Sequence, residues 1–349
     1  MSEARGGISS HVEPVAAVVA APEGRARTAV LVLALCCFFW GFSFPVMPHC
    51  IRSIERHVLG AAAEGIKDPG SQLTIFARLG IEAAFLGWRF GIASILYWIL
   101  TRSRQKKFTA VDIRGGLWVG GLFTLGMLAQ IEGLRYARPS VSGFLTSLVV
   151  VYTPFGQALL FKRSVARNVW LGVFVALIGM GLLSIPNPES LPKDIPPAPI
   201  PFLGEGLTML GALFFAGQML AVDHFAVQMD TTKMTFLMFV TLGVLSSVLG
   251  VGLAGHELYR HEVVSALFGD WMLVGGVIGL VIFSTIVSLH LMNTFQPHIS
   301  AATASVVYCL EPVFATTFSV VLQQEVLTPI TLVGGAVILA AVLIVARKT

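Results

Sequence analysis

Apolar runs of roughly 20 residues recur along almost the whole chain, separated by short polar segments. An α-helix of that length crosses the hydrocarbon core of a bilayer, so each run predicts one membrane-spanning helix. The pattern predicts an all-α polytopic membrane protein with ten transmembrane helices as two five-helix sets. The predicted spans lie at about 28–47, 86–100, 117–136, 140–161, 169–185, 203–223, 234–254, 271–295, 299–322 and 329–346.

Three polar segments fall outside these spans. Residues 1–27 lack a continuous apolar run, and we expect a disordered cytoplasmic tail there. Residues 48–80 carry mixed charges and turn residues, which favours a long extramembrane insert that could bind an external partner. Residues 186–202 contain too many prolines to continue a helix, so we expect an extended linker between the two halves.

The two halves repeat each other. Pro139 aligns with Pro297 at an offset of 158 residues, and further positions of the predicted fourth and ninth helices align at the same offset. These further positions are Ser142 with Ser300, Ser147 with Ser305, and Pro154 with Pro312. Each repeat, 28–185 and 203–346, holds an odd number of spans, so the second repeat should be inverted in the membrane.

The distribution of charge predicts the orientation of the chain. Most Lys and Arg residues fall in loops on one side of the predicted bilayer, and such loops are cytoplasmic. Both termini are then cytoplasmic, and we expect an integral protein of the plasma or inner membrane. Only 12% of the residues are charged, against roughly 25% in soluble domains, so no soluble domain of ordinary size is expected.

Composition and motifs exclude several functions. The net charge of +4 at pH 7 follows from membrane topology and does not predict nucleic-acid binding. No Gly-Lys-Ser/Thr phosphate-binding loop is present, so ATPase activity is not expected. The four cysteines lack metal-ligand spacing, and His224 with Asp223 and Asp230 lacks a second cluster, so we predict no metal and no cofactor. The expected partners are the lipid bilayer and a small-molecule substrate.

Several short motifs follow one another in a characteristic order. They are Trp40-Gly41, Arg89-Phe90, Leu134-Arg-Tyr136, Glu311-Pro-Val-Phe314, and Glu325 followed by Gly334. Over 28–185 and 203–346 the chain thereby resembles the EamA-type branch of the drug/metabolite transporter superfamily. The resemblance implies two five-helix repeats and transport without ATP, most often export of amino acids and other small metabolites. The chain departs from that family in its long 48–80 insert and in Lys162-Arg163, where an acidic residue is usual.

Polar and aromatic side chains inside the predicted helices are the candidates for substrate binding, because polar groups at this depth must face protein or water. Glu311 either holds substrate or a proton in a cavity, or bonds to backbone groups that Pro312 leaves free. Its counterpart in the first repeat is Thr153, so the repeat itself does not require a charge there. The candidates are Trp40, Gln130, Ser147, Gln218, Asn293, Ser305, Tyr308 and Glu311.

Proton coupling has three candidates: Glu311, Glu132 and His290. Glu132 and His290 occupy equivalent places in the two repeats, at the same offset of 158 residues. They could exchange protons, because His titrates near neutral pH. They could also be solvated groups near helix ends, and the sequence leaves both interpretations open. Arg89 is predicted to open a helix and to extend its guanidinium to the membrane interface.

These patterns predict a secondary active transporter that exports a small organic metabolite such as an amino acid by alternating access. Proton coupling is a further hypothesis. The alternative is a polytopic membrane enzyme or sensor without transport activity. An enzyme should carry paired catalytic groups at adjacent helix ends, and a sensor should carry a soluble output domain. We find neither in the sequence, so no catalytic residues are predicted.

Overall fold

The computed structural model describes residues 23–60, 69–103, 105, 107–136, 139–185, 201–254, 258, 260–322 and 326–347. The α-helices are α1 (Glu23–Leu59), α2 (Ile75–Thr101), α3 (Ala110–Tyr136), α4 (Pro139–Thr146), α5 (Val149–Leu160), α6 (Arg167–Leu183), α7 (Leu203–Phe225), α8 (Thr231–Ala254), α9 (His261–Gly269), α10 (Trp271–Gly279), α11 (Ser288–Phe295), α12 (Ala301–Tyr308), α13 (Glu311–Val321) and α14 (Pro329–Ala346). Short helices of other types are η2 (Pro69–Gln72), the π-helix η4 (Leu280–Val287) and η5 (Gln296–His298). The part of the chain that the structure describes contains helices and turns but no strand.

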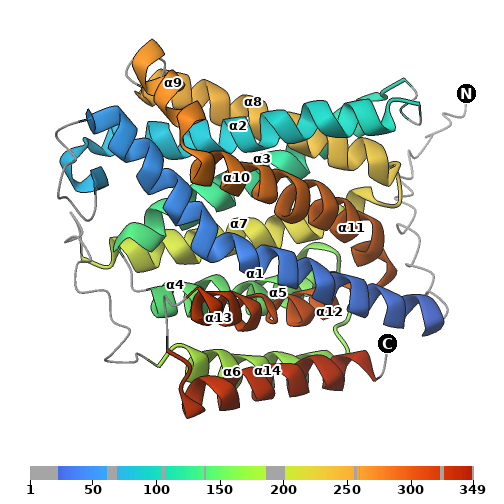
Figure 1. The fold of residues 1–349 in the computed structure, drawn as a ribbon. Coiled ribbons are helices and arrows are strands. Elements are labelled where there is room, and N and C mark those ends of the chain that lie inside the picture. The colour runs from blue at the N-terminus through green and yellow to red at the C-terminus, as the bar shows by residue number, and fades with distance from the viewer. Residues whose placement is uncertain are drawn as a thin grey trace, which may run out of the picture.

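The long helices run side by side across the molecule (Figure 1). In the described ranges, eight helices are long and apolar enough to cross a membrane. Two further apolar helices, Phe144–Leu160 and Arg167–Leu183, are shorter. The prediction of an all-helical polytopic membrane fold agrees with this result, and the presence of ten transmembrane spans stays a prediction.

The first helix is much longer than the predicted 28–47 span. α1 continues from Glu23 to Leu59, although Pro45 and Pro48 lie inside it. The prediction that the disordered tail reaches residue 27 was therefore wrong, and the extramembrane position of residues 48–80 stays a prediction. The second helix likewise begins at Ile75, within the predicted insert. The rest of the predicted tail, the middle of the insert and most of the predicted linker (1–22, 61–68 and 186–200) lie outside the described residues.

Buried ion pairs explain why charged residues of the predicted insert belong to helices. Glu55 on α1 accepts a hydrogen bond from Arg135 on α3 (Nη2 to Oε1, 2.5 Å), and its side chain is fully buried. Glu82 on α2 lies 3.5 Å from the same guanidinium. Arg78 on α2 pairs with Glu132 on α3 at 3.1 Å. The opposite charges compensate one another where α1, α2 and α3 meet, so these residues can be buried.

A second polar contact holds the end of α1 against the start of α10. Asp270 caps α10, where its Oδ1 accepts hydrogen bonds from the backbone N–H groups of Met272 and Leu273. Its Oδ2 accepts a hydrogen bond from Ser53 on α1 (2.5 Å) and lies 3.6 Å from His57 Nε2. The hydrogen bond from Ser53 is the largest of the interactions that hold the pKa of Asp270 below its usual value. This end of α1 is therefore fixed by hydrogen bonds to α10.

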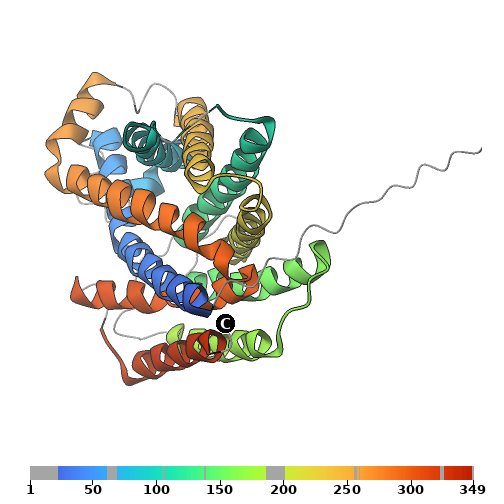
Figure 2. The same ribbon diagram turned by 90° about the vertical axis from the view of Figure 1, so that its right-hand side faces the viewer.

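The two repeats meet in closely packed helix pairs. α2 packs against α8, α3 against α7, and α6 against α14. Small residues permit the approach of α2 and α8: a Cβ atom at Gly80 would lie 2.2 Å from the backbone nitrogen of Ala254. A Cβ atom at Gly250 would lie 2.7 Å from the backbone nitrogen of Ala84. The view in Figure 2 shows the α6 and α14 pair along one edge of the bundle. Small residues that let backbones approach closely are typical of contacts between membrane helices.

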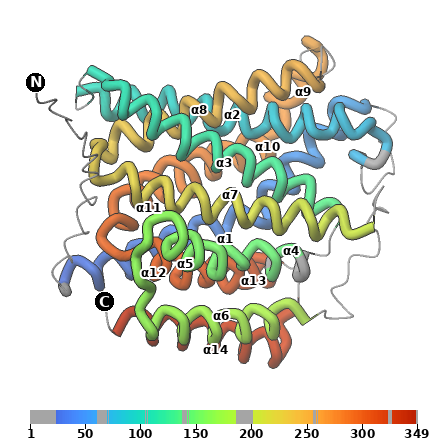
Figure 3. The backbone as a smooth tube through the Cα atoms, turned by 180° about the vertical axis from the view of Figure 1, so that it is seen from behind, coloured from blue at the N-terminus to red at the C-terminus, as the bar shows by residue number. Residues whose placement is uncertain are grey.

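Helix interruptions occur at related places in both repeats. A turn at Ser147-Leu148 separates α4 from α5, and a turn at Cys309-Leu310 separates α12 from α13. Pro312 lies in the first turn of α13, where its missing N–H leaves no intrahelical bond unmade. α5 and α12 lie beside each other, so the interruptions come together in the middle of the molecule (Figure 3). The π-helix η4 interrupts a further span, and such bulges are frequent at functional sites.

Candidate functional site

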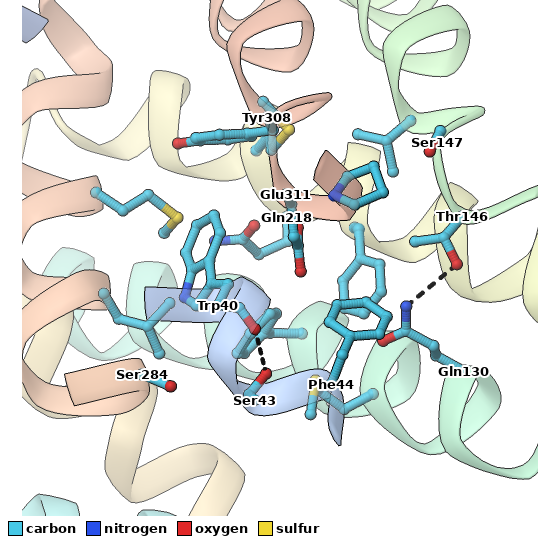
Figure 4. Close-up of a pocket in the computed structure, with 18 of the residues that line it drawn as sticks. Trp40, Ser43, Phe44, Gln130, Thr146, Ser147, Gln218, Ser284, Tyr308 and Glu311 are labelled. Carbon is cyan, nitrogen blue, oxygen red and sulfur yellow. Dashed lines mark hydrogen bonds between the residues drawn. The ribbon is translucent and has the colours of Figure 1, made fainter. Parts of the chain in front are cut away.

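The interrupted helices surround a cavity of about 150 Å³ (Figure 4). A cavity of about this volume holds a ligand of the size of benzene. Its walls come from α1, α2, α3, α7, η4 and α11, from α4 and α5 with the turn between them, and from α12 and α13 with the turn between them. The lining residues are Trp40, Ser43, Phe44, Met47, Arg89, Phe90, Phe123, Met127, Gln130, Leu134, Thr146, Ser147, Val149, Val150, Phe215, Gln218, Met219, Ser284, Leu289, Met292, Ser305, Tyr308, Cys309, Glu311 and Pro312.

The cavity wall is mainly aromatic and sulfur-containing. The ring of Trp40 meets the ring of Tyr308 edge-on at a centroid distance of 5.3 Å. Methionine side chains also line the cavity, and flexible thioethers of this kind adapt to ligands of different shape. An apolar wall with a few polar groups at fixed places is the usual composition of a small-molecule site. The other aromatic and methionine residues of the wall are Phe44, Phe90, Phe123, Phe215, Met47, Met127, Met219 and Met292.

The structure brings together seven of the eight residues predicted to bind substrate. Those that line the cavity are Trp40, Gln130, Ser147, Gln218, Ser305, Tyr308 and Glu311. Asn293 is the exception, because it is not among the lining residues and donates a hydrogen bond to Thr235 Oγ1 (3.1 Å). Gln296, one turn further on, accepts a hydrogen bond from the Tyr308 hydroxyl at 3.0 Å. The hydrogen bond from this segment to the cavity residue Tyr308 is thus made by Gln296, a position that the sequence did not single out.

Glu311 lies directly after the turn between α12 and α13, at the first residue of α13. Its carboxylate points toward the middle of the cavity (Figure 4). Within the described residues, no hydrogen bond or ion pair reaches this carboxylate. The positive end of the α13 dipole favours a negative charge at this position. Glu311 therefore presents an accessible acceptor for a cation or a proton.

Arg89 was predicted to reach the membrane interface, and the structure shows that this prediction was wrong. The residue lies in the middle of α2, is 4% exposed and lines the cavity. Its Nε donates to Thr285 Oγ1 (2.7 Å), and its Nη1 lies 4.0 Å from Met47 Sδ. The guanidinium carbon lies 5.3 Å from the centre of the Phe90 ring. In the part of the chain that is described, no carboxylate pairs with this guanidinium. The signal available in the sequence was a single arginine within an apolar run.

Two glutamines add amide groups to the cavity wall. Gln130 donates a hydrogen bond from Nε2 to Thr146 Oγ1 at 3.1 Å, which links α3 to α4 (Figure 4). Gln218 on α7 is 3% exposed, and its Nε2 is a buried donor without a hydrogen-bond partner among the described residues. A buried polar group without a partner is costly, so its donor capacity is available to a ligand. The Gln218 amide is therefore a donor in the cavity wall that can bind an acceptor of the ligand.

The other two candidates for proton coupling lie elsewhere. Glu132 belongs to the ion-pair cluster with Arg78 and also lies 3.9 Å from Arg135 Nε. His290 on α11 forms a hydrogen bond between its Nδ1 and the Tyr97 hydroxyl (2.8 Å). Neither lines the cavity. Arg78 and Tyr97 lie near opposite ends of α2, so the structure does not bring Glu132 and His290 together.

Comparison with known proteins relates the chain to transporters. The model of the EamA-like transporter family matches residues 73–185 and 202–347, one match in each half. A protein of Archaeoglobus fulgidus named an uncharacterized transporter is 26% identical over 318 residues, which cover 91% of this chain and 85% of the relative. A second uncharacterized transporter of that organism is 21% identical over 320 residues, covering 91% of this chain and 98% of the relative. A crystal structure of a protein with 15% sequence identity shares the fold, with a TM-score of 0.64 over 92% of this chain and 98% of that chain.

Proposed function

Because the chain belongs to the EamA-like transporter family and is a membrane transporter, we propose that it exports a small organic solute by alternating access. The observation that carries the proposal is the cavity between the two repeats, lined by interrupted helices and by the unpaired carboxylate of Glu311. Transporter sites are commonly built from discontinuous helices at the interface of two repeats. The family also supports a function without catalysis.

The proposal includes an inverted arrangement of the two repeats across ten spans. The contacts between corresponding helices support it. Gly80 near the start of α2 meets Ala254 at the end of α8, and Ala84 meets Gly250, so these helices run antiparallel. α6 and α14 also run antiparallel, because Gly179 approaches Gly334 while Gly172 approaches Val345. Opposite directions of equivalent helices are what a two-fold axis in the membrane plane requires.

We propose that rocking of one repeat against the other opens the cavity to each side in turn. The interruptions at Ser147-Leu148 and Cys309-Leu310 support this motion, because turns absorb changes of backbone angle that a continuous helix resists. α1 and α14 place Glu23 and Ala346 on the same side of the molecule (Figure 1). Together with the distribution of Lys and Arg, this supports cytoplasmic termini.

Proton coupling is proposed at Glu311. A carboxylate that accepts either a proton or a cationic group of the substrate cannot hold both at once. Binding of one therefore promotes release of the other, and this competition couples the two movements. The location of Glu311 in the cavity supports this assignment over Glu132 and His290, whose side chains have partners outside the cavity.

An external partner that binds residues 48–80 stays a prediction.

Comparison of culture media tests the transport proposal. Cells that produce the protein are expected to release at least one small solute several-fold faster than cells that produce the Glu311→Gln variant at equal level. The solute is identified by untargeted mass spectrometry of the medium and then tested with purified protein in liposomes. Matching media from the two strains would reject export, and so would liposomes that move none of the solutes found to be enriched.

A further inference from the structure

We propose that Arg89 and Glu311 make the cavity selective for small zwitterions, with Arg89 binding the anionic group of the substrate and Glu311 its ammonium group. The inference rests on the proposed transport function and names the substrate class of the same site. It assigns a binding role to Arg89, which the sequence places among ordinary interfacial arginines.

The surroundings of Arg89 indicate an incomplete site. Its contacts with Thr285 and Met47 orient the guanidinium but supply no negative charge. Thr285 lies on η4, where the π-helix departs from regular helix geometry, so the interruption contributes the side chain that holds Nε. A guanidinium has five donors and is always charged, so its remaining donors suit a planar, bidentate carboxylate. Burial at 4% exposure without such a partner is unfavourable until an anion binds.

Gln218 gives independent evidence for a ligand with hydrogen-bond acceptors. Its Nε2 is buried and unpartnered among the described residues, and it lines the same cavity as Arg89. Figure 4 shows both Gln218 and Glu311 among the residues that line this cavity. An amide donor in the same cavity as a carboxylate suits a ligand that has an acceptor as well as a cationic group. The carboxylate and ammonium of a small zwitterion meet this description.

The selectivity follows from charge compensation. A zwitterion neutralises both Arg89 and Glu311 when it binds, and the site then closes without an uncompensated charge. An amine leaves the guanidinium unpaired, and a carboxylic acid leaves Glu311 unpaired. The amine and the acid each make one charged interaction fewer than the zwitterion and leave one buried charge of the protein uncompensated. Sites that pair with both charges of a ligand therefore discriminate strongly against ligands that lack one of them.

Matched probes test the inference. Leucine carries both charges, 3-methylbutylamine is leucine without the carboxylate, and 4-methylpentanoate is leucine without the ammonium group. We expect isothermal titration of the purified protein in detergent to give leucine a Kd at least tenfold lower than either analogue. Arg89→Gln should raise the Kd of leucine at least tenfold and change that of 3-methylbutylamine less than twofold. Glu311→Gln should weaken leucine and the amine but not the acid.

Two further variants keep the test independent of folding. Arg89→Lys retains the charge and should keep a preference of at least threefold for leucine over the amine. Arg102→Gln changes an exposed arginine just after α2 and should leave all three Kd values unchanged. The inference fails if leucine does not bind, if it binds no more tightly than 3-methylbutylamine, or if Arg89→Gln weakens all probes equally. The binding results stand apart from transport: leucine preference without any solute movement in liposomes would reject the proposed function alone.

Discussion

Leucine at position 250 is expected to prevent α2 and α8 from packing and to lower the yield of folded protein at least tenfold. The nearest atoms to a side chain at Gly250 are Ala84 N at 2.7 Å and Ala84 Cα at 2.8 Å. Backbone atoms within a helix cannot yield as the end of a side chain can, so the two helices must separate. Overpacking by single methylene groups already costs about 1–3 kcal/mol, and leucine adds four carbon atoms.

Size-exclusion chromatography of detergent extracts, combined with thermal unfolding of the monodisperse fraction, measures this effect. Gly252 on the same helix is the matched control, because a Cβ atom there meets nothing within 4 Å. Gly252→Leu is expected to keep the yield and Tm of the unmodified protein. Equal yields and Tm values for the two leucine variants would show that α2 and α8 do not pack as described.

Glutamine at position 311 is expected to remove the dependence of transport on a pH gradient and to reduce gradient-driven leucine uptake into liposomes at least tenfold. Glutamine preserves the size of the side chain and one of its two acceptor oxygens but cannot take up a proton or carry a negative charge. Uptake of radiolabelled leucine is measured with an imposed gradient and after an ionophore has collapsed it. The unmodified protein should respond to the collapse, and the Glu311→Gln variant should not.

Variants at other acidic and titratable positions test whether the loss of the response to the pH gradient is specific to Glu311. Glu262 is an exposed carboxylate on α9, and Glu262→Gln should retain the full response to the gradient. Glu132→Gln and His290→Gln compare the remaining candidates. If one of these abolishes the response while Glu311→Gln retains it, then the proton site lies outside the cavity and the assignment to Glu311 is wrong.

The sequence predicted the membrane fold and much of the cavity because both follow from local patterns. Apolar length predicts membrane helices, and the aligned positions around Ser147 and Ser305 located the helices that are interrupted in the structure. Tyr308 and Glu311 follow Ser305 at intervals of one helical turn, which brought them into the same prediction. Membership of the transporter family, inferred from short motifs, was confirmed by the family match in both halves.

The errors arose where contacts distant in sequence decide the environment of a charge. Glu55 and Arg135 are 80 positions apart, and their ion pair allows α1 to extend into the predicted insert as far as Leu59. Arg89 has its only strong hydrogen bond in the described structure to Thr285, 196 positions away. Neither partner could be identified from local sequence, so the charges were assigned to water and to the interface. Asn293 was predicted to line the cavity and does not, because the sequence does not determine which side of a span that contains a π-helix faces the cavity.

Accessibility of the cavity from both sides of the membrane tests the central claim of alternating access most directly. A cysteine replaces Ser147, a half-buried residue of the cavity wall, in a protein whose four native cysteines are changed to alanine. A membrane-impermeant thiol reagent is applied to right-side-out and inverted vesicles, with and without leucine. We predict labelling from either side and several-fold slower labelling from both when leucine is present. Labelling from one side only, under all conditions, would contradict alternating access.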